Sequence, residues 1–228
     1  MKYLKELIKS IFPILKYLVL SYFVIFAFFV IYILFGGLDV VDYVVNYATY
    51  VLVIFNFIYA FYLLKKYKVF CRRTTCILPF VMLGIAIACF GNMLIFRVNT
   101  NEVIKMNMLF LVFSSVIVGP LVEELLFRNV LVNKLLSFNN RVVTILLASF
   151  IFAIMHSGIL NIVYTFMLGI ILNTVFIKEK NLLYPLIIHS SANLVVLFLV
   201  GFNSYILFLS FILLVISLFI VKRDYLLK

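Results

Sequence analysis

Long apolar runs, separated by short polar stretches, follow one another along almost the whole chain. The runs show no alternation of apolar and polar positions, which favours helices over strands. Most of them exceed the roughly 17 residues that a helix needs to cross the hydrocarbon core of a bilayer. We therefore predict eight transmembrane helices, at Ile11–Leu34, Tyr43–Leu64, Cys76–Phe96, Met106–Leu131, Val142–His156, Ile159–Ile177, Leu182–Val200 and Tyr205–Val221.

Basic residues lie mainly on one side of this predicted arrangement. If the N-terminus is cytoplasmic and every helix crosses, only Arg97 and Lys105 of the 19 Lys and Arg residues fall outside, and Arg128 lies within the fourth helix. Cytoplasmic loops of membrane proteins carry an excess of Lys and Arg. The pattern therefore predicts a multi-pass protein of the cell membrane with both termini in the cytoplasm.

Composition supports an all-α membrane bundle. The 228 residues are 67% hydrophobic and 12% charged, whereas soluble domains are about half apolar and a quarter charged. The net charge of +11 comes from residues that flank apolar runs, which favours contacts with anionic headgroups over nucleic acid. No linker or soluble segment interrupts the chain, so we predict one domain, 1–228, with the motif-bearing core at about 106–200.

Two glutamates and two histidines fall within predicted spans, where ionisable groups are expensive and usually functional. Six of the eight acidic residues lie in predicted loops or termini, and the other two are the neighbours Glu123 and Glu124. The two histidines of the chain, His156 and His189, also lie in apolar segments. These four residues are therefore the first candidates for a functional site.

Helical spacing relates these residues to two further polar ones. Glu124 and Arg128 are four residues apart, so they share a helix face and can pair. His189 and Asn193 have the same spacing and project to one side of the seventh helix. Glu123 is rotated by about 100° from its neighbour, so we expect it to face a histidine on another helix.

Carboxylate, histidine and amide groups in a low-dielectric pocket suggest hydrolysis, because a carboxylate can act as a general base on water. Histidine and asparagine can donate hydrogen bonds to a developing oxyanion. The same groups can instead be a buried ion pair and hydrogen bonds between helices. A zinc site is the chemical alternative, since Glu and His are zinc ligands, but no His-Glu-x-x-His segment occurs.

Three ordered motifs carry a family resemblance that covers about Gly119 to Leu197. The chain resembles the CPBP family, the CAAX proteases and bacteriocin-processing enzymes also called the Abi family. The hallmark of this family is Glu-Glu-x-x-x-Arg, then Phe-x-x-x-His, then His-x-x-x-Asn. The matching residues are Glu123-Glu124-x-x-x-Arg128, Phe152-x-x-x-His156 and His189-x-x-x-Asn193.

The resemblance implies an intramembrane endopeptidase of the CAAX-protease fold. It implies that Glu123 acts as the base, together with His156, on the attacking water. His189 and Asn193 would form the oxyanion site. Both metal-dependent and metal-free glutamate mechanisms are held for the family, so the resemblance implies either no cofactor or a divalent metal such as zinc.

The family also implies a supporting role for Glu124 and Arg128, which would hold the reacting groups in place. This chain departs from the family at two positions. Asn129 follows the arginine where the family usually has glycine, and Asn173 lies four residues after Gly169 where a second glycine is frequent. Both positions concern close helix packing rather than chemistry.

Two other functions are compatible with the sequence. A non-enzymatic bacteriocin-immunity or scaffold protein would keep these motifs for structure alone. A transporter or proton channel would use the buried carboxylates, but no convincing internal repeat supports it. We expect a peptide or membrane-protein substrate, and the Ile-, Phe-, Lys- and Asn-rich composition suggests a bacterial source. The sequence does not predict the oligomeric state.

Overall fold

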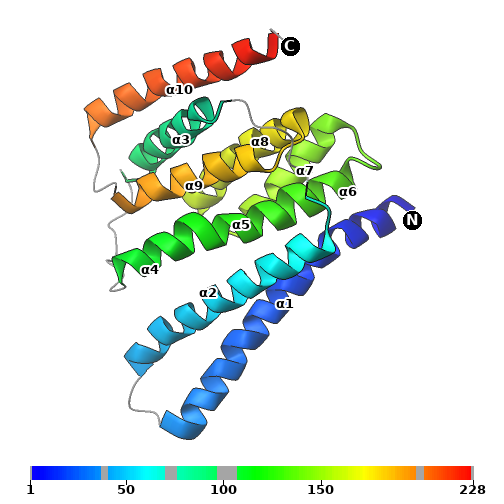
Figure 1. Cartoon of the computed structure of the whole chain (residues 1–228), viewed down its shortest axis with the longest axis vertical. Helices are drawn as coiled ribbons and strands as arrows, with labels where there is room; N and C mark the ends of the chain where they lie inside the picture. Colours follow the sequence, from blue (N-terminus) through cyan, green and yellow to red (C-terminus); the bar gives the residue numbers. More distant parts are fainter. Residues whose placement is uncertain (1, 37–40, 70–75, 97–106, 199–202, 227–228) are drawn as a thin grey trace.

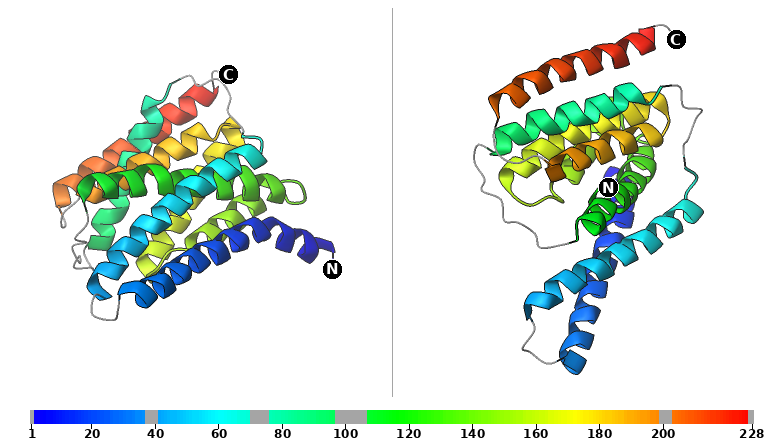
Figure 2. Two further views of the ribbon diagram at one scale, coloured as in Figure 1. Left: turned by 60° about the horizontal axis from the view of Figure 1, so that its bottom comes forward. Right: turned by 60° about the vertical axis from the view of Figure 1, so that its left-hand side comes forward.

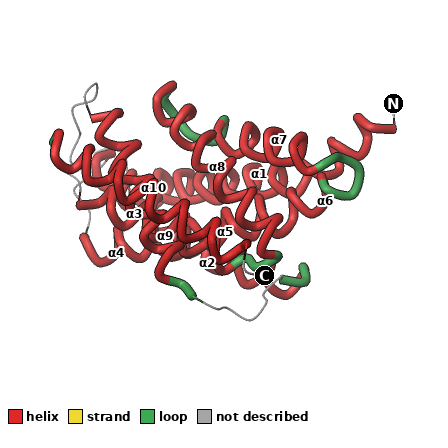
Figure 3. Tube along the Cα trace, turned by 90° about the horizontal axis from the view of Figure 1, so that it is seen from above, coloured by secondary structure: helices red, strands yellow, loops and turns green. Residues whose placement is uncertain are grey.

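The computed structural model describes residues 2–36, 41–69, 76–96, 107–198 and 203–226. These residues form helices and short loops, with no strand among them (Figure 3). The consecutive helical pieces between Met108 and Leu135 form one continuous rod, called the fourth rod below. With these pieces counted as one, the described helices make eight rods. Their bounds are α1 Lys2–Gly36, α2 Val41–Lys66, α3 Leu78–Phe96, α4 Met108–Val112, η1 Phe113–Val118, α5 Gly119–Glu124, η2 Leu125–Val132, α6 Asn133–Leu135, α7 Arg141–Ala153, α8 Ile159–Glu179, α9 Leu183–Phe198 and α10 Ser204–Leu226.

The predicted helical membrane bundle is confirmed. Among the described residues, four helices are long and apolar enough to cross a membrane, and four more are shorter apolar helices. Large apolar side chains cover the outside of the bundle, and Leu109 and Ile159 are 81% and 77% exposed. A surface of this kind is stable in contact with lipid rather than water.

The rods alternate in direction, so both ends of the described chain lie at the same end of the bundle (Figure 1). The α1–α2 pair lies on one side and the α3–α10 pair on the other (Figures 1 and 2). Between these pairs lie the fourth rod, α9 and the α7–α8 hairpin. This even number of alternating rods agrees with the prediction that both termini lie on one side of the membrane. That this side is the cytoplasmic one stays a prediction.

Two apolar cores hold the rods together. One core joins α1 and α2 to the fourth rod, α7 and α8, and the other joins α3, α8 and α9. Small residues allow close approach, as is usual between membrane helices. A Cβ atom on Gly169 would lie 3.1 Å from both Cα and Cβ of Ser149. Asn173 also contacts this serine, donating to its Oγ at 2.9 Å.

Asparagine caps and turn residues set several helix ends. Asn107 and Asn140 accept backbone N–H groups at the starts of α4 and α7, which satisfies donors that a helix start leaves free. The fifth predicted span ran to His156, but α7 ends at Ala153. The chain turns there, and Gly158, with a φ of +84°, leads directly into α8. The predicted ends at Met106 and Val200 lie outside the described residues.

Candidate active site

The fourth rod carries the first cluster of site residues where its winding changes. Glu124 ends α5, and Arg128 lies within the wider π-helical turns of η2. Such π-helical insertions occur frequently at functional sites. Arg128 donates from Nη1 to Glu124 Oε1 at 2.9 Å, and neither side chain is exposed to solvent. The pairing expected from the spacing of four residues is confirmed.

His189 joins this ion pair from α9. Its Nδ1 lies 2.8 Å from Glu124 Oε1, the same oxygen that accepts from Arg128. A carboxylate oxygen can only accept, so Nδ1 carries the proton and donates. His189 is 4% exposed. A single buried oxygen therefore ties α9 to the fourth rod through two donors.

Glu123 does not bond to Arg128, and it faces a histidine of another helix, as its rotation on the helix predicted. Its side chain is 33% exposed, in contrast to the fully buried Glu124. Its Oε2 lies 3.8 Å from His189 Nε2, which is beyond hydrogen-bond length but short enough for one water molecule to bridge the two atoms. This oxygen has no hydrogen-bond partner in the described part of the chain.

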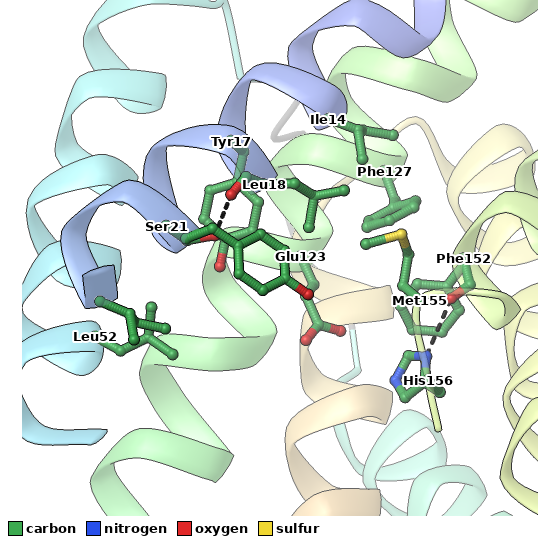
Figure 4. A pocket seen from close by; sticks show the side chains of 12 residues that line it. Ile14, Tyr17, Leu18, Ser21, Leu52, Glu123, Phe127, Phe152, Met155 and His156 are labelled. Carbon is green, nitrogen blue, oxygen red and sulfur yellow. Dashed lines mark hydrogen bonds between the residues drawn. The ribbon is translucent and has the colours of Figure 1, made fainter. Parts of the chain in front are cut away.

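A cavity of about 390 Å³ brings Glu123 and His156 together. The Glu123 carboxylate and the His156 ring both point into it (Figure 4). His156 Nδ1 lies 3.0 Å from the Phe152 carbonyl oxygen, which can only accept, so this nitrogen is protonated. In the neutral ring, Nε2 is then free to accept a proton.

The walls of this cavity are mostly apolar and come from four rods. Residues of α1 and α2 form one side, and residues of η2 and of the α7 end form the other. None of the described Lys or Arg side chains lines it. Besides the two ionisable residues, the lining residues are Ile14, Tyr17, Leu18, Ser21, Tyr22, Ile25, Leu52, Phe127, Phe152 and Met155.

The Phe152 ring contacts three of the candidate site residues. The Arg128 guanidinium carbon lies 4.4 Å from the centre of its ring, a cation–π contact. The rings of His156 and His189 contact the same phenyl ring at centroid distances of 4.9 and 5.9 Å. Sequence spacing alone placed the two histidines at different depths, about 20 and 10 Å into their spans. In the folded structure both histidines nevertheless contact one and the same phenyl ring.

Asn193 is placed differently from the other candidates. Its Nδ2 donates to the Ser115 carbonyl oxygen of η1 at 2.9 Å. It does not line the cavity that contains Glu123. The bond is possible because η1 is π-helical, where the regular pattern of backbone hydrogen bonds changes. Asn193 therefore fastens α9 to the fourth rod one turn beyond His189.

A metal-binding set is not formed by the described side chains. No group of three or more His, Cys, Asp and Glu residues among them converges closely enough to hold an ion. Glu124 Oε1 is already occupied by two donors. The described residues therefore do not fit the three-ligand zinc site, and we derive no step through a metal.

Sequence reasoning did not find the contribution of α1 and α2 to the site. Tyr17 and Leu52 line the cavity, yet no motif marks either residue. Both lie in apolar runs where every face looks alike. One local signal is the polar hydroxyl of Tyr17 within a span, which donates to Asn56 Oδ1 of α2 at 2.9 Å.

The fold and this site define a class of protein: a helical membrane bundle with a carboxylate–histidine cluster beside an internal cavity. Residues 105–195 match the model of the Rce1-like type II CAAX prenyl endopeptidases. This segment contains all six candidate residues. The match supports the resemblance to the CPBP family that the three motifs of this segment indicated.

Two curated proteins are also similar to this chain. The chain is 31% identical over 138 residues to the membrane-embedded CAAX protease MroQ of Staphylococcus aureus (strain USA300), covering 51% of this chain and 56% of that protein. It is 37% identical over 79 residues to the UPF0177 protein YxdF of Lactococcus lactis, covering 34% and 43%. The chain thus spans about half the length of the relatives it matches. No solved structure matches it.

Proposed function

We propose that this protein is an intramembrane endopeptidase that hydrolyses a peptide bond with water activated by Glu123 and His156. The observation that carries the proposal is the shared cavity into which both side chains point. A carboxylate and a histidine in such a cavity can hold one water molecule between them and remove its proton. The match to the CAAX prenyl endopeptidases supports the same reaction.

The reaction begins with attack of the water oxygen on the carbonyl carbon of the peptide bond. Glu123 takes the proton of that water as the new C–O bond forms. His156, with Nδ1 bound to the Phe152 carbonyl, offers Nε2 as a second acceptor that orients the water. The proton then passes to the leaving nitrogen as the C–N bond breaks, which leaves a carboxylic acid and an amine.

His189 stabilises the negative charge that develops on the carbonyl oxygen. Its Nδ1 donates to Glu124, and both ring nitrogens are donors when the ring is protonated. Nε2 then carries a proton that can be donated to the oxyanion. Arg128 balances the negative charge of Glu124 and holds the Glu124 side chain in position. In the proposed reaction Asn193 positions α9, and it supplies a donor if its amide rotates towards the substrate.

Substitution of the two cavity residues tests the proposal. Purified protein in nanodiscs is incubated with a pool of proteome-derived peptides and with a prenylated CAAX peptide, and new peptide ends are read by mass spectrometry. Glu123→Gln keeps the shape but removes the base, so we expect cleavage to fall by about 10²- to 10⁴-fold. His156→Ala should cause a similar loss. Glu179→Gln, at the end of α8, is the matched control and should cleave normally.

Three outcomes would contradict the proposal. Full cleavage by both variants would exclude the assigned base. Absence of cleavage by the wild-type protein, combined with retained immunity or binding of a partner protein, would favour the non-enzymatic alternative. Ion flux in proteoliposomes without peptide cleavage would favour a transporter. Metal analysis of the purified protein, together with cleavage in the presence of a chelator, tests the zinc alternative directly.

A further inference from the structure

A second cavity of about 370 Å³ lies outside the candidate active site, where α2 ends and the fourth rod reaches α6. Six of its seven lining residues are polar. In the views of Figures 1 and 2, this end of the bundle also contains the start of α1. The lining residues are Tyr67, Lys68, Asn129, Val130, Asn133, Lys134 and Ser137.

Hydrogen bonds build the wall of this cavity. Asn129, which replaces the glycine usual in the family, donates from Nδ2 to the Lys68 carbonyl oxygen at 3.2 Å. Asn133 Nδ2 in turn donates to the Asn129 carbonyl oxygen at 2.7 Å. The first bond joins the segment after α2 to the fourth rod, and the second lies within the fourth rod. The position of the cavity is therefore set by side chains that a glycine could not replace.

No carboxylate of the described residues neutralises the two lysines of the cavity. Neither Lys68 nor Lys134 forms a salt bridge with a carboxylate within the described ranges. Lys134 Nζ donates to the Lys9 carbonyl oxygen at 3.2 Å, which leaves two of its three protons. The acidic residue of α1, Glu6, is already paired with Lys9 at 2.8 Å. The cavity is therefore lined by two lysines for which the described residues supply no counter-charge.

The position of the cavity indicates where a counter-charge would come from. The candidate spans Tyr47–Lys66 and Met108–Leu136 both end beside it, which is the level at which a bilayer presents its headgroups. Basic pockets between membrane helices bind anionic headgroups. We propose that this cavity binds the phosphate of an anionic phospholipid, with Lys68 and Lys134 as the charged donors. The site does not depend on the proposed peptidase reaction.

Titration of lipids into the detergent-solubilised full chain tests this proposal by native mass spectrometry. The probes are dioctanoyl-phosphatidylglycerol and dioctanoyl-phosphatidylcholine. We expect the anionic lipid to bind at least tenfold more tightly. Lys68→Gln and Lys134→Gln should each weaken its binding by about fivefold and together by roughly 30-fold. Arginine at both positions should retain binding, since the charge is kept.

Lys5→Gln is the matched control, because it removes a basic residue from the same end of the bundle without touching the cavity, and it should leave binding unchanged. Circular dichroism checks that each variant is helical. If the double variant loses helicity, the exposed Lys68→Gln alone must show its fivefold effect. Equal loss with Lys5→Gln, unchanged binding by the Lys68 variant, or equally tight binding of inorganic phosphate would overturn the proposal.

Discussion

Substitutions of the buried Glu124–Arg128 pair can separate effects on stability from effects on activity. Arg128→Met keeps an apolar stem but removes the guanidinium. Glu124 would then be a fully buried carboxylate with His189 as its remaining donor. Loss of one partner from a buried ion pair costs about 3–5 kcal/mol, because the other charge is left without compensation. The lost contact with the Phe152 ring is part of this cost.

The double variant Glu124→Gln with Arg128→Met should recover most of the stability that Arg128→Met alone loses. Two buried charges disappear together, and such replacements by neutral groups are often neutral or stabilising by about 1–4 kcal/mol. In the wild-type protein, Arg128 Nε and Nη2 have no hydrogen-bond partner in the described part of the chain, so the pair is incompletely satisfied. We expect a coupling energy of about 3 kcal/mol between the two positions.

Unfolding in mixed micelles with increasing SDS, followed by circular dichroism, measures these free energies. The double variant should remain inactive in peptide cleavage even though it is stable, because His189 loses its charged acceptor. A loss below about 1 kcal/mol for Arg128→Met, or a double variant as unstable as the single one, would refute the reasoning. Full cleavage by the double variant would refute the supporting role of the pair.

Two further substitutions test the packing that positions the site. Gly84→Ala should destabilise the protein by about 1–3 kcal/mol, because a Cβ atom there would overlap the Ile188 carbonyl oxygen of α9. Thermal unfolding measures this loss. Unchanged stability would show that α3 does not pack this closely against α9. Tyr17→Phe should cost about 0.5–1.5 kcal/mol by losing the bond to Asn56, and Tyr22→Phe, whose residue is 69% exposed, is its control.

The sequence by itself determined the class of fold. Apolar runs of this length cannot be buried in a soluble core, and backbone groups in lipid must be satisfied within helices. Local spacing also determined that Glu124 pairs with Arg128, since residues four apart share a helix face. The order of the three motifs further indicated the family, because such residues are rare in spans.

Tertiary structure decided which helices enclose the site and how its residues meet. No motif marks Tyr17 or Leu52, because membrane helices are apolar on all faces and associate by shape. The π-helical turns before and after Glu124, and the Phe152 ring between the two histidines, depend on contacts between rods. Position along one helix could not predict them, because each requires the packing of several helices at once.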